Sequence, residues 1–238
     1  MARRGSGPTL PYELLAGVQP CPGGWLVTSA KLQGISLAGP APEVYPRFID
    51  VLDHRPALSV VALHLPLGLP NGHEAGGRTC DRAARRLLGR PRSAAIASPP
   101  SRQDLRAWKS GQPTAVSAVT RSLLARIAEA YEVIGSYHQR TVFEVHPELS
   151  FFQLNGEAPL RYPKHTRAGR EERVALVQER IPGMQSALNA HPPGTKPAHV
   201  VDGLAMLLTA RRIRARSIAR LPDMPEWDSE GLRMEFVY

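Results

Sequence analysis

The chain contains few cysteines and no long apolar run. Cys21 and Cys80 are its only cysteines, and no Cys/His spacing suits a structural zinc site. This usage fits a reducing compartment, and we expect a cytoplasmic protein. No run of about 18 apolar residues occurs, so no transmembrane helix is predicted. Residues 1–10 lack the apolar stretch of a signal peptide and are predicted to form a loose N-terminal arm.

Aromatic residues are also scarce, at 6% of the chain. No stacking platform of the kind that binds single-stranded nucleic acid is visible in the sequence. We therefore expect the three tryptophans, Trp25, Trp108 and Trp227, to pack in the core or in turns.

Acidic residues are outnumbered, because 21 Asp and Glu face 30 Lys and Arg and leave a net charge of +9. A balance this basic is consistent with a polyanionic partner, and equally with the codon composition of a gene rich in arginine, alanine, glycine and proline. The apolar content of 42% is enough for a buried core and excludes a disordered chain. The length favours one large domain over two small ones.

Hydrophobic patterns predict an α/β domain, with strands early, mixed elements in the middle and a helix near the end. The predicted strands cover residues 14–19, 25–28, 34–38, 58–65, 142–145 and 233–237. The predicted helices cover residues 43–52, 78–89, 114–134, 167–178 and 199–213. Residues 58–65 are almost entirely apolar, which indicates a strand buried on both faces.

The most informative stretch is FEVHPELSF, residues 143–151. Glu144 and His146 are two residues apart, so on a strand they share one face. Pro147 ends the strand, and Glu148 then falls at the first or second position of the next helix. For Glu148 alone the simpler interpretation is a favourable charge at a helix start. Acidic residues at strand ends are often catalytic or ligand-binding residues in α/β proteins, so we interpret the whole stretch as a functional site.

Eight segments in order resemble the DUF429 family of predicted nucleases, which belongs to the ribonuclease H-like superfamily. They are GVQPCPGGW (17–25), LHLPLGLP (63–70), GRTCDRAARRLLG (77–89), PPSR (99–102), FEVHPELSF (143–151), GREERVALV (169–177), HVVDGLAM (199–206) and GLRMEFVY (231–238). The resemblance implies one ribonuclease H-like α/β domain over residues 11–238, with a mixed sheet, antiparallel first strands and flanking helices.

The resemblance also implies phosphodiester hydrolysis with two Mg²⁺ or Mn²⁺ ions held by carboxylates. Three positions depart from the family pattern: Gln19, His64 and His199 stand where that pattern has acids. Glu144, Glu148 and Asp202 remain as the catalytic candidates. The metal candidates are Glu144, Asp202, His64, His199 and Gln19.

Losing three carboxylates favours an eroded metal site, because Mg²⁺ held by so few acids would bind weakly. The preferred hypothesis is therefore a protein that binds nucleic acid or a nucleotide with little or no Mg²⁺-dependent phosphodiesterase activity. One alternative is an active hydrolase that uses His64 and His199 with an acid to hold Zn²⁺ or Mn²⁺. Another is a non-enzymatic protein-interaction module that keeps the fold.

Arginine and lysine side chains near these motifs are candidates for phosphate contacts. Arg78, Arg82 and Arg85 share one face of a predicted helix, although Asp81 could also pair with them locally. Lys164 and Arg170 flank Thr166, which is a plausible helix N-cap. The phosphate-binding candidates are Arg78, Arg85, Lys164 and Arg170.

Overall fold

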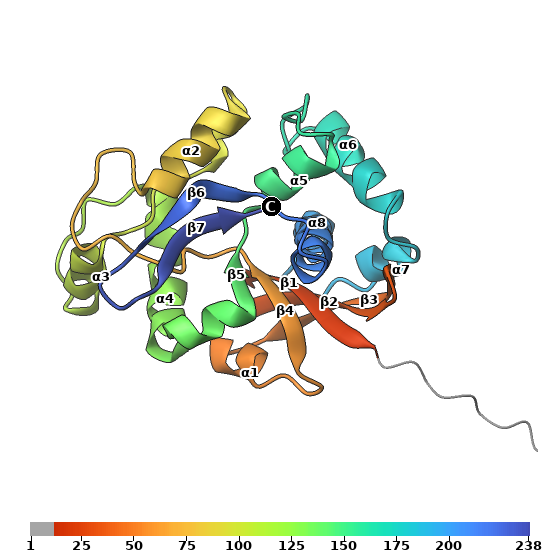
Figure 1. Ribbon diagram of the computed structural model, residues 1–238, viewed down its shortest axis with the longest axis horizontal. Helices are drawn as coiled ribbons and strands as arrows, with labels where there is room; N and C mark the ends of the chain where they lie inside the picture. The colour runs from red at the N-terminus through yellow and green to blue at the C-terminus, as the bar shows by residue number, and fades with distance from the viewer. Residues whose placement is uncertain (1–11) are drawn as a thin grey trace, which may run out of the picture.

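A five-stranded mixed sheet forms the centre of the molecule in the computed structural model, which describes residues 12–238 (Figure 1). The strands are β1 (Glu13–Cys21), β2 (Gly24–Gln33), β3 (Ser36–Tyr45), β4 (Leu58–Leu63) and β5 (Val142–Glu144). Their order is β3-β2-β1-β4-β5. The first three pair antiparallel, whereas β4 and β5 run parallel to β1. This topology confirms the α/β class and is consistent with a ribonuclease H-like fold, and the predicted arm at 1–10 lies outside the described residues.

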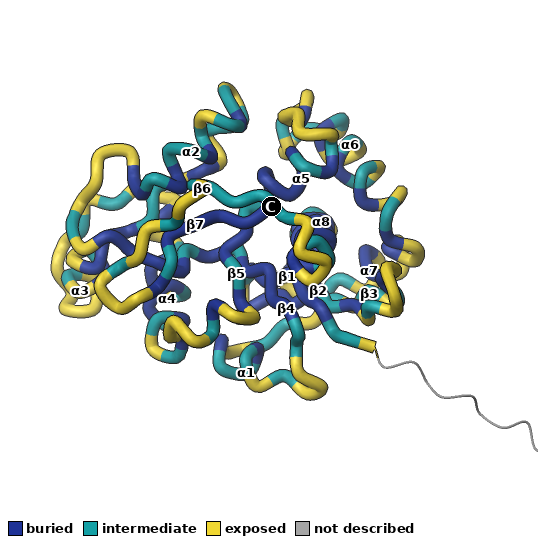
Figure 2. Tube along the Cα trace, in the orientation of Figure 1, coloured by how far each residue is buried: buried dark blue, intermediate teal, exposed yellow. Residues whose placement is uncertain are grey.

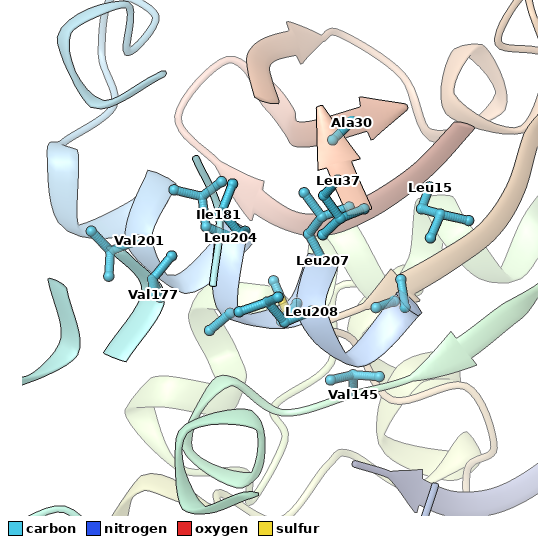
Figure 3. Packing of buried hydrophobic residues seen from close by; sticks show 14 of the residues in the cluster. Leu15, Ala30, Leu37, Val145, Val177, Ile181, Val201, Leu204, Leu207 and Leu208 are labelled. Carbon is cyan, nitrogen blue, oxygen red and sulfur yellow. The ribbon is translucent and has the colours of Figure 1, made fainter. Parts of the chain in front are cut away.

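Helix α8 (Pro197–Arg214) packs directly on one face of the sheet. Figure 3 shows Leu204, Leu207 and Leu208 of α8 against strand residues such as Leu15 and Leu37, and all of them belong to one buried cluster. Three further helices complete this layer: α5 (Pro147–Leu154), α6 (Arg167–Gln178) and α7 (Met184–Asn189). Figure 2 shows the central strands and much of α8 as buried.

The approach of α8 to β1 requires glycine. A Cβ at Gly17 would lie 2.2 Å from the backbone oxygen of Gly203, and one at Gly203 would lie 2.3 Å from Oγ1 of Thr28. Both contacts are far inside van der Waals distance, so the helix can lie this close to the strands only because neither residue has a side chain.

The opposite face of the sheet is covered by α1 (Phe48–Leu52), α3 (Arg102–Lys109) and α4 (Ala118–Val133). The alternation along β1 explains the two layers, because Leu15 packs with the α8 side and Ala16 and Val18 pack with the α4 side. A fully buried Trp25 anchors this second cluster.

A third cluster joins α2 (Thr79–Leu88) to a two-stranded ribbon, β6 (Arg220–Trp227) and β7 (Arg233–Val237). The ribbon is antiparallel, α2 packs on it, and β7 contacts β5. Cys80 is fully buried here beside Leu88 and Phe236, as packing rather than as an exposed thiol. Short 3₁₀ helices, η1 (Arg92–Ala95) and η2 (Ser136–Arg140), lie in the connections.

Two expectations from the sequence are wrong for residues 34–52. Residues 43–45 belong to β3, so the helix predicted over 43–52 begins only at Phe48, and the strand predicted over 34–38 extends to Tyr45. The prolines at 40 and 42 indicate breaks, but β3 pairs only with β2 and is an edge strand, where a missing N–H costs little.

Besides the two 3₁₀ helices, two α-helices and one strand were not anticipated: α3, α7 and β6. For α3 a signal was present, because Ser101 and Asp104 form a reciprocal capping box, with Asp104 N–H donating to Ser101 Oγ at 3.0 Å and Ser101 N–H donating to Asp104 Oδ2 at 2.9 Å. Strand β6 contains Pro222 and Pro225, and two prolines in eight residues argue against a strand when only the sequence is known.

Candidate functional site

A pocket of about 370 Å³ opens where the parallel strands β4 and β5 end. His64 follows β4, and Glu144, Val145 and His146 close β5 and lead into α5. The 94–99 segment and α4 form the far wall, and Lys164 stands at the edge. Apolar side chains supply much of the lining, among them Leu65, Ile96, Leu123, Ile127 and Phe236.

Glu144 is buried at this strand end, with 3% of its surface exposed. Its carboxylate accepts two hydrogen bonds from the Arg78 guanidinium, at 2.8 and 2.5 Å, and a third from the Leu67 backbone N–H at 2.8 Å. Burial raises the pKa of Glu144, and the positive charge of Arg78 opposes that rise. The carboxylate is therefore held by the protein's own cation.

Arg78 precedes α2 and is only 1% exposed. Its guanidinium donates to Asp81 at 3.2 and 2.9 Å, to the Gly68 carbonyl at 2.9 Å, and to both oxygens of Glu144. These contacts use all five N–H groups of an arginine side chain. Arg78 thus has no donor left for a phosphate in this arrangement, and it joins two buried carboxylates instead.

Glu148 occupies the second position of α5, after Pro147 at the first. It is buried and pairs with Arg173 of α6 at 2.5 Å. Arg173 also donates to the Gly169 carbonyl at 3.0 Å, while its Nε has no hydrogen-bond partner in the described part of the chain. Glu148 therefore ties α5 to α6 through a buried ion pair.

Asp202 lies on α8, where Lys164 Nζ contacts its Oδ2 at 3.2 Å. Burial raises the pKa of Asp202, and Lys164 opposes this. One turn earlier, the His199 carbonyl accepts a 2.6 Å hydrogen bond from Gln19 Nε2 of β1. Burial lowers the pKa of the His199 imidazole, an effect that Asp202 opposes. Gln19, His199 and Asp202 thus gather where β1 meets α8.

His64 and His146 lie edge to face, with ring centroids 4.7 Å apart. Burial, with a contribution from Lys164, lowers the pKa of His64 to about 4. Burial also lowers the pKa of His146 well below its usual value, assisted by His64. Both rings are therefore neutral at pH 7. His146 Nδ1 accepts from the Glu148 N–H at 3.2 Å, whereas no residue from 12 to 238 hydrogen-bonds to the His64 ring.

The residues predicted to hold a metal do not form a metal centre. Among residues 12–238 no three His, Cys, Asp or Glu side chains are arranged to bind an ion. Glu144, Glu148 and Asp202 each face a cation of the chain instead, namely Arg78, Arg173 and Lys164. The set Gln19, His64, Glu144, His199 and Asp202 therefore fits neither the Mg²⁺ or Mn²⁺ pair nor the Zn²⁺ site considered from the sequence.

The remaining phosphate-binding candidates lie at the periphery. Arg85 donates to the Ile96 carbonyl at 2.8 Å, and Arg170 donates to the His165 carbonyl at 2.8 Å. Thr166 caps α6 as predicted, accepting from the Gly169 N–H at 3.1 Å. Lys164 is 57% exposed and reaches the pocket itself.

Sequence reasoning missed Arg173 and the 94–99 segment. Arg173 had a signal, because it stands between Gly169 and Val177 on the buried stripe of α6, and an arginine in such a stripe requires a buried acid. The 94–99 segment had none, since an irregular Ala/Pro-rich stretch does not indicate which elements it will lie against.

No helix between residues 12 and 238 is long and apolar enough to cross a membrane. Neither the curated proteins nor the solved structures contain a match to this chain. One family model does match, over residues 17–227, and it is described as a protein of unknown function, DUF429. Because this match spans most of the sequence, the chain belongs to the DUF429 family.

Proposed function

We propose that the pocket at the ends of β4 and β5 binds a nucleotide, and that it does so without Mg²⁺-dependent cleavage of a phosphodiester bond. The observation that carries this proposal is the pairing of Glu144, Glu148 and Asp202 with Arg78, Arg173 and Lys164. The negative charge of each of these carboxylates is already balanced by a cation of the chain, so together they do not form an acidic site that is free to bind Mg²⁺.

The walls of the pocket suit a flat ring. Its volume of about 370 Å³ lies within the usual range for small-molecule pockets. Ile96, Leu123 and Phe236 supply apolar surface for a nucleobase. The neutral His64 ring has one donor and one acceptor, and neither is used by a protein partner among residues 12–238. That pair suits the hydrogen-bonding edge of a base.

Lys164 is the cation placed to contact a phosphate. It lines the pocket, is more than half exposed and, among residues 12–238, has Asp202 as its one ion-pair partner. A phosphate oxygen can therefore bind Nζ while Asp202 keeps its contact, because an ammonium group has three donors. Arg85 and Arg170 do not line this pocket and belong to two neighbouring hollows, so Lys164 is the cation on which the proposal rests.

Metal-dependent cleavage would require Glu144 to leave Arg78. Leaving one partner of a buried pair uncompensated costs about 3–5 kcal/mol. Mg²⁺ would have to offset that cost at a position where residues 12–238 provide no group of three His, Cys, Asp or Glu side chains able to hold an ion. We therefore assign binding, and not hydrolysis, to this pocket.

Calorimetric titration with the four ribonucleoside 5′-monophosphates, in EDTA and then in excess Mg²⁺, tests this function. We expect binding that is equal under both conditions, with no product detected by chromatography. His64→Leu should weaken it between about two- and tenfold, and Lys164→Met about tenfold or more, as expected for the loss of a neutral and of a charged hydrogen bond.

His54→Leu and Lys31→Met are matched controls, because neither residue lines the pocket, and both should bind as the unaltered protein does. Absence of binding by every nucleotide would contradict the proposal. So would Mg²⁺-dependent cleavage of DNA or RNA that disappears in Glu144→Gln.

A further inference from the structure

A second hollow, of about 540 Å³, lies between η2, Phe143 of β5 and the β6–β7 ribbon. It shares no lining residue with the pocket that contains His64. Arg140, Arg220, Arg233 and Trp227 line it. Hydrogen bonds between Gln139 and the Arg233 backbone, at 2.7 and 3.0 Å, hold η2 against β7 and keep these side chains together.

Large aromatic side chains are exposed at this place. Trp227 is 60% exposed, which contradicts the expectation that it packs in the core or in a turn. Tyr137 of η2 is 68% exposed, and the Arg140 guanidinium lies over its ring, 5.8 Å from the centroid. The far end of the β6–β7 ribbon is exposed as well (Figure 2). Exposed indole and phenol faces beside arginines are not required for folding.

The hollow also has guanidinium donors to spare. Arg140 has no hydrogen-bond partner for its side chain among residues 12–238. Within residues 12–238, Arg220 uses only Nη1 for hydrogen bonds, and Nη1 contacts both oxygens of the buried Glu235 at 2.7 Å. Glu235 also faces Arg233 at 3.4 Å, so one carboxylate is shared by two cations. The nearby Asp228 and Glu230 both pair with Arg102 of α3, which does not line this hollow.

We propose that this surface, formed by Tyr137, Arg140, Arg220, Trp227 and Arg233, binds single-stranded nucleic acid. The guanidinium groups contact successive phosphates, and the indole of Trp227 stacks on a base. A duplex hides its base faces in its own stack, so the exposed aromatic rings specify a single strand. An acidic protein would use the arginines but would gain little from Trp227.

Fluorescence anisotropy with labelled twelve-nucleotide oligo(dT) and oligo(U) tests this surface. Trp227→Ala should weaken binding about five- to 150-fold, the range for loss of one base stack. Trp227→Phe keeps an aromatic face and should retain most of the affinity. Arg140→Ala should weaken binding and lower the dependence of log K on log salt concentration by about 0.7.

Trp108→Ala and Arg121→Ala are matched controls, since both residues are exposed on helices outside the hollow, and both should stay within about twofold of the unaltered protein. Circular dichroism of every variant shows whether the fold is retained. His64→Leu should leave oligonucleotide binding to this surface unchanged, because His64 does not line the hollow. The proposal for this surface and the proposal for the nucleotide pocket can therefore be refuted independently.

Three results would overturn the proposal. The first is binding of a duplex of equal length as tightly as the single strand. The second is an affinity that Trp227→Ala leaves unchanged. The third is equally tight binding of polyglutamate with the same dependence on Arg140, which would identify a surface for acidic proteins.

Discussion

At the scale of single residues, buried ion pairs are the main feature of the candidate site. Arg78 compensates Glu144 and Asp81 together, and all three are buried. The family resemblance implies that, in ribonuclease H-like nucleases, the carboxylates of the site bind metal ions. Here the arginine supplies the positive charge permanently, so folding stability and the chemistry of the strand end depend on one side chain.

Arg78→Met should lower the free energy of unfolding by about 3–5 kcal/mol, because it leaves buried carboxylates without a counterion. Urea denaturation at pH 7 measures the change. Arg121→Met, at an exposed position, should shift it by less than about 0.5 kcal/mol. Adding Glu144→Gln to Arg78→Met should recover part of the loss, and failure of Arg78→Met to destabilise would refute the role assigned to this residue.

The two partly buried imidazoles, His64 and His146, predict a pH dependence of stability. The pKa of His64 is lowered to about 4, so below its ordinary value of 6.5 the unfolded chain binds more protons than the native one. The stability that neutral His64 contributes is therefore complete above about pH 6.5 and is lost as the pH falls toward 4. His146 acts in the same direction, and Lys164 strengthens both effects.

Glu144 and Asp202 act in the opposite direction, because burial raises their pKa values and the native state binds protons more readily than the unfolded one. Comparing urea unfolding of His64→Leu with that of the unaltered protein from pH 7 to pH 4.5 isolates the histidine. The stability of the variant should fall less over this range. Parallel curves for the two proteins would contradict the assignment.

At the scale of elements, the contact between β1 and α8 sets the geometry of Gln19 and His199. The two elements approach through Gly17 and Gly203, and the Gln19 side chain then reaches the His199 carbonyl. The sequence indicated both elements, with α8 predicted over 199–213 and observed over 197–214. The sequence could not indicate how closely β1 and α8 approach each other. The missing Cβ atoms of Gly17 and Gly203 become informative only once the structure shows which backbone lies opposite each glycine.

Gly17→Ala should destabilise the protein by about 1–3 kcal/mol or more, since the new Cβ meets backbone atoms of α8 that no rotamer change can move away. Thermal unfolding measures the effect. Gly135→Ala is the matched control, because nothing lies within 4 Å of a Cβ there. Equal melting temperatures for the two variants would show that the helix can shift without cost.

At the scale of the whole molecule, the α/β class, the mixed sheet and most helices could be predicted from periodicity and from the family resemblance. The composition of the site could be predicted in part: His64, Glu144 and Lys164 do line one pocket. Their partners could not, because Arg78 and Glu144 are 66 positions apart in the sequence and only the fold makes them an ion pair. Trp227 was misjudged for the same reason, since its exposure depends on how the ribbon lies on η2.

The prolines of β3 affect how copies of this protein meet one another. A sheet whose outermost strand has free amide groups can recruit a strand from a neighbouring molecule. Pro40 and Pro42 remove two such donors from β3, and the opposite border of the sheet is a strand of only three residues with β7 beside it. Both borders of the sheet therefore offer few unpaired backbone groups to a strand from a neighbouring molecule.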